Sequence, residues 1–233
     1  MDAVVMAAGE GTRLRPITER WPKPVLPIDG RPVIATLLRE LAAAGCGRAV
    51  VVTGHLAEQV EELVGDGRAF GLEVRTVRQP GVLGSADAVR RALDAGADTP
   101  CLVLAADTVF TPGDIGRFAE AFVRSGAAGA MSGRRDPPAE APQRAAIKIV
   151  DGLVVEPIDD DPANPVGSAP MWGLGPDMVP FLAGLSGPPF ELGVAFERAI
   201  ADGLAVAGLE IGKTRDLTHP VDLVMENFTY LET

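Results

Sequence analysis

Apolar positions in the first half of the chain fall into two alternating patterns. Short continuous apolar runs predict buried β-strands at 3–7, 48–53, 72–77 and 101–105. Apolar residues at helical spacing predict α-helices between them, at 33–44, 57–64, 85–95 and 113–124. Strands that are apolar throughout and alternate with helices are typical of a parallel sheet covered on both faces. We therefore expect an α/β fold with a mostly parallel central sheet and helices on both faces.

The second half of the chain shows a different pattern. Strand-like runs at 144–150 and 153–158 flank Asp151-Gly152, a turn dipeptide that predicts a β-hairpin. The remaining pattern predicts, in chain order, a strand at 171–174, a helix at 190–202, a strand at 205–211 and a closing helix at 220–231. The stretch 134–142 is rich in proline and charge, which predicts a mobile loop.

Charge is distributed unevenly along the chain. The formal net charge of −11 over 233 residues disfavours binding to nucleic acid or to an anionic membrane. Lysine and arginine are nevertheless enriched at the start, where the first 31 residues contain Arg13, Arg15, Arg20, Lys23 and Arg31. Such a local concentration suits a small phosphorylated ligand. Two cysteines make no disulfide framework, and no apolar run approaches the ~20 residues of a membrane span, so we expect a cytoplasmic protein.

The loop after the first predicted strand carries the candidate chemistry. It reads Ala7-Ala8-Gly9-Glu10-Gly11-Thr12-Arg13-Leu14-Arg15-Pro16 and continues to Pro22-Lys23-Pro24. Small residues let backbone N–H groups approach phosphate oxygens closely, Arg13 adds a fork of donors, and Lys23 adds a compact positive charge. Ligands of parallel α/β sheets bind beyond the carboxyl ends of the strands. The pattern therefore predicts a loop that binds phosphate.

Three other interpretations of this loop fit less well. A Walker A loop would end in Gly-Lys-Ser/Thr, which is absent. A dinucleotide fingerprint would need a third glycine where the chain has Leu14, and an acidic residue where the second strand ends in Thr53-Gly54-His55. A flexible glycine turn without a ligand would leave Arg13 and Pro22-Lys23-Pro24 unexplained.

Residues 6–16 together with Pro22-Lys23-Pro24 resemble the signature of the sugar-1-phosphate nucleotidyltransferases, the NDP-sugar pyrophosphorylase family. The resemblance implies one Rossmann-like domain of the glycosyltransferase-A type over 1–233. Its nucleotide-binding part would be 1–130, and its acceptor-binding part, with the second metal ligand, 131–233. The resemblance also implies nucleotide binding by the backbone of Ala8, Gly9, Gly11 and Thr12, and catalytic roles at the triphosphate for Arg13 and Lys23.

Two aspartates match the metal-binding positions of that family. Asp107 follows the predicted strand 101–105, and Asp216 precedes Leu217-Thr218-His219-Pro220. The resemblance implies that both bind Mg²⁺, the expected cofactor. Magnesium prefers one or two carboxylates completed by phosphate oxygens and water, which fits a pair of aspartates and a triphosphate. Capping of a turn or helix is the alternative role of each aspartate.

The segment 77–88 resembles the base-recognition segment of the family. The nucleotide-binding candidates of this segment are Gln79, Gly84 and Ser85. Gln79 stands five residues before Gly84, and Ser85 is also the expected cap of the helix that follows. A glutamine amide offers a donor and an acceptor, which match the N3–H and a carbonyl of uracil or thymine. Gln79 therefore favours UTP or dTTP. A surface-loop glutamine without a ligand is the alternative.

The acceptor side departs from the family pattern. Glu156 matches a glutamate expected to bind the sugar, but the lysine that usually follows is missing, and Lys148 is the candidate replacement. Pro170 and Trp172 also depart from the family's later segment, which keeps a non-sugar phosphate acceptor open.

We therefore expect an enzyme that transfers a nucleoside monophosphate from UTP or dTTP to a sugar 1-phosphate and releases pyrophosphate. A phosphate monoester is already largely dianionic at neutral pH, so no general base is required, and His55 and His219 are expected to be structural. The alternatives are a cytidylyltransferase acting on a choline-like or phosphonate acceptor, and a non-catalytic nucleotide-sugar sensor. The expected partners are the NTP and the phosphorylated acceptor, without nucleic acid or membrane; a homo-oligomer is compatible with the sequence, and no appended domain is expected.

Overall fold

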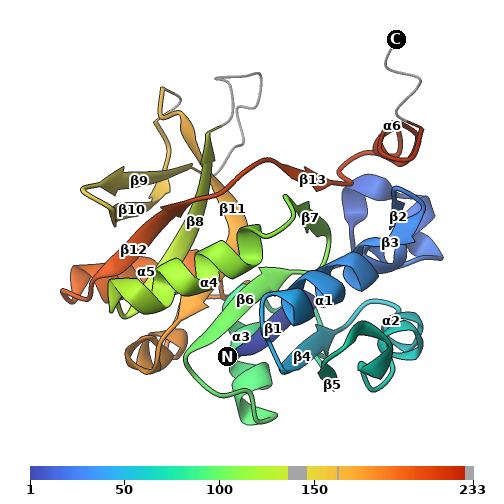
Figure 1. Ribbon diagram of the computed structural model, residues 1–233, viewed down its shortest axis with the longest axis horizontal. Helices are drawn as coiled ribbons and strands as arrows, with labels where there is room; N and C mark the ends of the chain where they lie inside the picture. Colours follow the sequence, from blue (N-terminus) through green and yellow to red (C-terminus); the bar gives the residue numbers. More distant parts are fainter. Residues whose placement is uncertain (136–145, 162, 229–233) are drawn as a thin grey trace.

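The computed structural model describes residues 1–135, 146–161 and 163–228 (Figure 1). Its main sheet is built from β1 Asp2–Ala7, β4 Arg48–Thr53, β5 Glu73–Arg78, β6 Cys101–Ala105, β8 Gly129–Arg135, β9 Ala146–Val150, β10 Leu153–Asp159, β11 Val166–Leu174 and β12 Val206–Glu210. The strand order is β5-β4-β1-β6-β11-β8-β12-β10-β9, with a further pairing of β11 with β9. The sheet therefore continues from the first half of the chain into the second.

The expectation of a mostly parallel sheet needs correction, because the sheet is mixed. Strands β5, β4, β1 and β6 run parallel, as the alternating pattern predicts, and β8 and β12 are also parallel. The other five pairings of this sheet, among its described residues, are antiparallel. The hairpin of β9 and β10 and the insertion of β11 between β6 and β8 reverse the strand direction in the second half.

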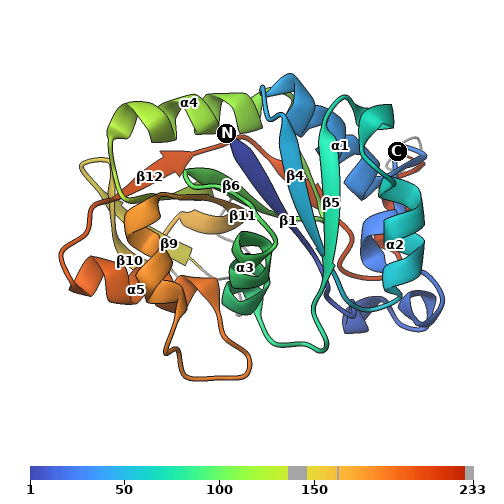
Figure 2. The ribbon, with the colours of Figure 1, turned by 90° about the horizontal axis from the view of Figure 1, so that it is seen from below.

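Helices cover both faces of the sheet, as predicted (Figure 2). They are α1 Val33–Ala43, α2 Ala57–Val64, α3 Ser85–Asp94, α4 Asp114–Ser125 and α5 Leu192–Ala201. Leucines and phenylalanines of α1 and α4, with valines of α2, pack on one face together with Ala3, Val5 and Ala7 of β1. α3 and α5 pack on the other face with Val4. Because both faces are buried, β1 is apolar at successive positions.

Two small sheets lie beside the main one. β2 Pro27–Ile28 pairs with β3 Arg31–Pro32, and β7 Thr108–Phe110 pairs with β13 Thr214–Asp216. A short helix, α6 Asp222–Met225, follows β13 and lies near β2 and β3 (Figure 1). A third apolar cluster joins these pieces to the loop after β1: Leu14, Leu26, Ile28, Val33 and Leu217. The loop at the carboxyl edge of the parallel strands is thereby packed against the segment that follows β13.

Several predicted elements differ from the observed ones. β8 was not predicted, since Gly129 and Gly133 are poor strand formers; a Cβ at Gly133 would lie 2.6 Å from Val166 Cγ1, so close packing requires the glycine. β11 begins at Val166, before the predicted start at 171. The closing helix is only Asp222–Met225, and 229–233 lie outside the described residues. Of the loop predicted at 134–142, positions 134 and 135 belong to β8, and 136–142 are not described.

No helix in the described parts of the chain combines the length and the apolar character needed to cross a membrane.

Candidate active site

The loop after β1 is a series of tight turns in which some residues are buried or hydrogen-bonded and others are exposed to solvent. Gly11 has φ 61°, and a Cβ there would lie 3.0 Å from Thr18 Cγ2, so glycine suits the position. The Thr18 hydroxyl donates to the Gly11 carbonyl over 2.9 Å. Leu14 is buried in the third apolar cluster, whereas Thr12 and Arg13 are exposed. The loop is therefore held by its apolar residue while its polar residues face outward.

The end of β4 supports the start of the same loop. A Cβ at Gly54 would lie 2.7 Å from the Ala8 carbonyl oxygen, so only glycine fits beneath the loop. His55 donates from its backbone N–H to the Ala8 carbonyl and from Nε2 to the Thr18 carbonyl, over 3.4 and 2.6 Å. The structural role expected for His55 agrees with these contacts.

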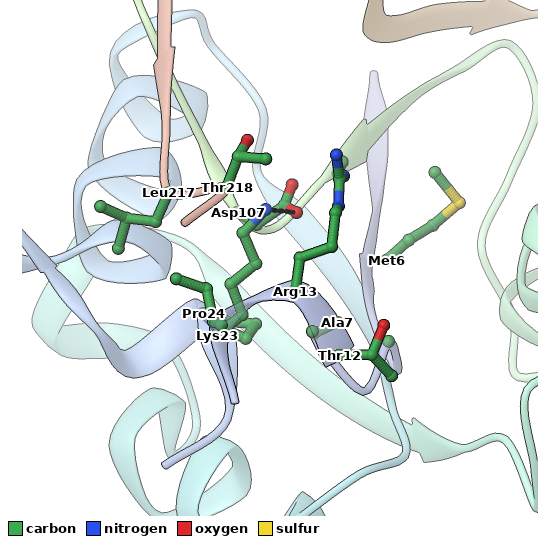
Figure 3. Close-up of a pocket in the computed structure, with 13 residues that line it drawn as sticks. Met6, Ala7, Thr12, Arg13, Lys23, Pro24, Asp107, Leu217 and Thr218 are labelled. Carbon is green, nitrogen blue, oxygen red and sulfur yellow. Dashed lines mark hydrogen bonds and ion pairs between the residues drawn. The ribbon is translucent and has the colours of Figure 1, made fainter. Parts of the chain in front are cut away.

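A cavity of about 290 Å³ lies at the carboxyl edge of β1 and β6 (Figure 3). It gathers most of the predicted phosphate and metal residues, which line it as Gly9, Gly11, Thr12, Arg13, Lys23 and Asp107. Leu217 and Thr218, from the segment after β13, complete the same wall. Segments almost two hundred residues apart in sequence thus meet around one polar space.

Lys23 and Asp107 form an ion pair inside this cavity. Lys23 Nζ donates to Asp107 Oδ2 over 2.6 Å, and the two side chains are 13% and 33% exposed. Arg13 extends into the same space beside them, and no ion pair involving Arg13 is present among the described residues (Figure 3). Two cations and one carboxylate therefore face a common volume, which suits a highly charged anion together with a cation.

Asp216 is positioned by the small sheet of β7 and β13, but unlike Asp107 it does not line the first cavity. In that pairing Asp216 is opposite Thr108, the residue that follows Asp107. Asp216 is exposed, and its Oδ1 accepts a hydrogen bond of 3.1 Å from the Thr218 hydroxyl. Among the described residues, no group of three or more His, Cys, Asp or Glu side chains forms a metal site. A pair of aspartates nonetheless fits Mg²⁺ when a triphosphate supplies other ligands.

A second cavity, of about 470 Å³, lies on the other side of the loop. It is lined by Ala8, Glu10, Gly54, His55, Arg78, Gln79, Pro80, Gly81 and Val82. Residues of the loop alternate between the two cavities, because Ala8 and Glu10 line this one whereas Gly9 and Gly11 line the first. A ligand that wraps around the loop would contact both sides.

The predicted base-recognition residues are only partly brought together. Gln79 is 6% exposed, and its Nε2 donates to the Gly84 carbonyl over 3.0 Å. Ser85 is the first residue of α3 rather than its cap, which is Gly84. The Ser85 hydroxyl donates to Glu191 Oε2 and accepts from the Leu192 N–H, both over 2.7 Å. It therefore ties α3 to α5, and nucleotide binding by Ser85 stays a prediction.

The predicted acceptor residues form a pair of their own. Lys148 Nζ donates to Glu156 Oε1 over 2.7 Å across the β9–β10 hairpin, and this contact raises the pKa of Lys148 above its ordinary value. Neither residue lines either of the two cavities. The pair lies in the second half of the sheet, and its role in acceptor binding stays a prediction.

Comparison with known proteins decides the family. Residues 2–168 match the family described as nucleotidyl transferase. The chain belongs to the nucleotidyl transferase family.

Relatives of this nucleotidyl transferase differ in their described activities. The low-salt glycan biosynthesis nucleotidyltransferase of Haloferax volcanii is 30% identical over 241 aligned residues, which cover 100% of this chain and 66% of that protein. The CMP-5'-(3-aminopropyl)phosphonate synthase of Streptomyces rubellomurinus is 40% identical over 121 residues, or 51% of this chain and 19% of that protein. The chain therefore spans at most about two thirds of the length of these two relatives.

The fold is shared with nucleotidyl transferases of known structure. A UDP-glucose pyrophosphorylase complexed with UDP-glucose superposes with a TM-score of 0.81 over 99% of this chain and 98% of that one, at 19% identity. At this identity the likeness concerns the fold alone.

Three residues in or beside the candidate site were not predicted from the sequence. Thr18 holds the loop, Thr218 lines the first cavity, and Asp87 accepts a hydrogen bond of 2.9 Å from Gln79 Nε2. Asp87 lies in the segment 77–88 used to infer base recognition, where an acidic residue in the apolar first turn of a helix was the available signal. Thr18 gives no such signal, because its partner is a backbone carbonyl.

Proposed function

We propose that this protein transfers a nucleoside monophosphate from an NTP to a sugar 1-phosphate and releases pyrophosphate. The observation that carries the proposal is the convergence of Arg13, Lys23 and Asp107 on one cavity beside the glycine-rich loop. Two cations suit a triphosphate, and a carboxylate suits the cation that accompanies it. Membership of the nucleotidyl transferase family supports the same reaction class.

The reaction is an in-line displacement at the α-phosphorus of the NTP. An oxygen of the acceptor phosphate attacks, the bond from the α-phosphorus to its bridging oxygen breaks, and pyrophosphate departs with that oxygen. The acceptor phosphate, with a second pKa of about 6, is already the nucleophile at neutral pH. Arg13 and Lys23 stabilise the charge that develops on the departing pyrophosphate, and the backbone of Gly9 and Gly11 orients the chain of phosphates.

Asp107 and Asp216 are the residues that would hold Mg²⁺. A bound magnesium ion supplies charge neutralisation at the transferred phosphoryl group. Lys23 Nζ lies 2.6 Å from Asp107 Oδ2, so the lysine charge and the carboxylate that would hold the cation share one part of the cavity.

A matrix of UTP, dTTP, GTP, CTP and ATP against a panel of phosphorylated sugars and alcohols tests this function. We expect pyrophosphate release with at least one sugar 1-phosphate, only when Mg²⁺ is present, and with UTP or dTTP as the preferred nucleotide. Binding of nucleotide sugars without pyrophosphate release from any pair would instead favour the sensor alternative.

A cytidylyltransferase acting on a phosphonate or choline-like acceptor is the second candidate. The departures from the family pattern at Pro170 and Trp172, both in β11, keep this candidate open. The indole Nε1 of Trp172 is buried and has no hydrogen-bond partner among the described residues, so this strand differs from a fully satisfied core strand. The relative that makes a CMP-linked phosphonate supports the same candidate. If activity in the substrate matrix were highest with CTP, the cytidylyltransferase would be the supported function.

A further inference from the structure

The side-chain amide of Gln79 has a fixed orientation. Its Nε2 lies 3.0 Å from the Gly84 carbonyl oxygen and 2.9 Å from Asp87 Oδ2. A carbonyl and an ionised carboxylate only accept hydrogen bonds, so both must face the nitrogen of the amide. A flip of the amide would place Oε1 against two acceptors at once. Both N–H hydrogens of Gln79 are therefore used within the protein, and Oε1 remains as the polar atom available to a ligand.

Asp87 is itself held rigidly in its ionised form. It is buried in the first turn of α3, and Arg91 Nε donates to its Oδ2 while an Arg90 Nη donates to its Oδ1, over 2.7 and 2.9 Å. Burial raises the pKa of Asp87, but the hydrogen bonds from Gln79 and the two arginines outweigh it and bring the pKa below its ordinary value. Asp87 therefore stays a fixed acceptor at neutral pH.

Gln79 lines the cavity on the side of the loop away from the triphosphate residues. A nucleotide whose phosphates contact Gly9 and Gly11 would extend its base toward Ala8 and Gln79. The base then faces the acceptor Oε1 of Gln79. A glutamine without the two internal hydrogen bonds could present either its N–H donor or its oxygen acceptor. At the ring nitrogen of the pairing edge, uracil, thymine and guanine carry an N–H, whereas cytosine and adenine carry a lone pair. Because the exocyclic amines of cytosine and adenine also donate, the selection requires that Gln79 Oε1 faces the ring nitrogen.

We propose that Asp87 is a positioning residue that fixes Gln79 as a pure acceptor and thereby selects nucleotides whose base carries a ring N–H. This specificity rests on the proposed function, because it assumes that an NTP occupies the two cavities. It extends the pairing expected from the sequence, in which Gln79 supplies both a donor and an acceptor. Backbone N–H groups must then bind the base carbonyls.

Equilibrium binding by calorimetry in Mg²⁺, without an acceptor, tests the proposal on the full chain. The probes are UTP, dTTP, GTP, CTP and ATP. We expect the best of the first three to bind about tenfold or more tightly than CTP and ATP, which is the scale of one hydrogen bond. Tighter binding of CTP or ATP than of all three would overturn the proposal.

Asp87→Asn removes the fixed acceptor, because an asparagine can turn its own amide toward Gln79. We expect the preference for the ring N–H bases to fall to about threefold or less. The matched control is Asp94→Asn, the same chemical change at an exposed position of the same helix, and it should keep the wild-type preference. If Asp87→Asn fails to fold, Asp87→Asn/Arg91→Met carries the same expectation, because it also removes the less exposed of the two arginine partners of Asp87. An unchanged preference in the folded variant contradicts the assignment.

A double-mutant cycle separates positioning from a general structural effect. In a Gln79→Met background, Asp87→Asn should not change the ratio of UTP to CTP affinity any further. An equal loss of preference with and without Gln79 would mean that Asp87 acts elsewhere, and the proposal would fail. Pyrophosphate release is measured separately, so wild-type protein that discriminates between bases but transfers no nucleotide would refute the proposed function and leave this inference standing.

Discussion

At the scale of single residues, the ion pair of Lys23 with Asp107 joins two side chains with different expected roles, phosphate binding and metal binding. The motif predicted a phosphate-binding lysine and a metal-binding aspartate, and the structure brings the two side chains within 2.6 Å of each other. Their contact could not be predicted, because it depends on how the turns at residues 12–25 fold back over β6. The motif therefore predicts which residues bind ligands, but the contacts between those residues depend on tertiary packing.

Replacement of Lys23 by methionine tests the role of its charge. The apolar stem is retained, so Lys23→Met should fold, while Asp107 loses its partner. We expect pyrophosphate release to fall by about 10²–10³-fold, the effect of removing a donor aimed at developing charge. Lys213→Met is the control, since Lys213 is exposed and lines neither cavity. Activity within about threefold of wild type in Lys23→Met would remove Lys23 from the catalytic residues.

Gly9 offers a test of the loop that separates binding from folding. A Cβ at Gly9 meets no atom within 4 Å, and the residue lines the first cavity. Gly9→Ala should therefore keep the wild-type melting temperature while its methyl group occupies ligand space and weakens UTP binding by about tenfold or more. Gly47→Ala, which also meets no atom within 4 Å but lies far from the loop in sequence, is the control for both measurements. A lower melting temperature with unchanged UTP affinity would mean that the glycine serves the fold.

At the scale of elements, β13 is a strand that the sequence pattern does not predict. It is a three-residue strand, too short for a periodicity, yet its pairing with β7 sets Asp216 beside the residue that follows Asp107. Arg215 fastens this strand to the turn between β2 and β3: its two Nη atoms bind the Asp29 carboxylate over 2.6 and 3.0 Å. Arg215 also donates to Glu226, next to α6. The position of Asp216, the proposed second metal ligand, therefore depends on contacts made by the neighbouring Arg215.

Arg215→Met should loosen β13 without removing a predicted ligand. We expect a melting temperature lower by about 2–4 °C at neutral pH and a higher Mg²⁺ concentration for half-maximal pyrophosphate release. Arg124→Met is the control, because its ion pair with Glu120 is exposed on α4. An unchanged magnesium requirement in Arg215→Met would show that Asp216 is positioned without this anchor.

The same anchor predicts a pH dependence of stability. Hydrogen bonding by Arg215 holds the pKa of Asp29 below its ordinary value of 3.8. A lowered pKa contributes stability that is fully present above the ordinary value and is lost as the pH falls through the folded-state pKa. The melting-temperature difference between wild type and Arg215→Met should therefore stay constant from neutral pH to about pH 5 and shrink below pH 4. A difference that grows as the pH falls would contradict the assignment.

At the scale of the whole molecule, the first half of the fold could be predicted from the sequence and much of the second could not. Strands such as Ala49–Val52 are apolar throughout, because helices cover both faces, and that pattern identifies a parallel sheet. β8 carries Gly129, which packs closely against Phe196, and Gly133, which packs closely against Val166, so its sequence does not resemble a strand. The antiparallel insertion of β11 depends on long-range pairing, for which no local pattern exists. The division of the domain at position 130 stays a prediction, and the sheet runs through both parts.

The most direct test of the central claim is magnesium-dependent pyrophosphate release by Asp107→Asn. The substitution keeps the size of the side chain and removes the charge that the proposed reaction needs at the carboxyl edge of β6. We predict release at least about 100-fold slower than in wild type, while Asp94→Asn stays at the wild-type rate and both variants melt within a few degrees of wild type. A wild-type rate in Asp107→Asn, with the same dependence on magnesium, would contradict the account.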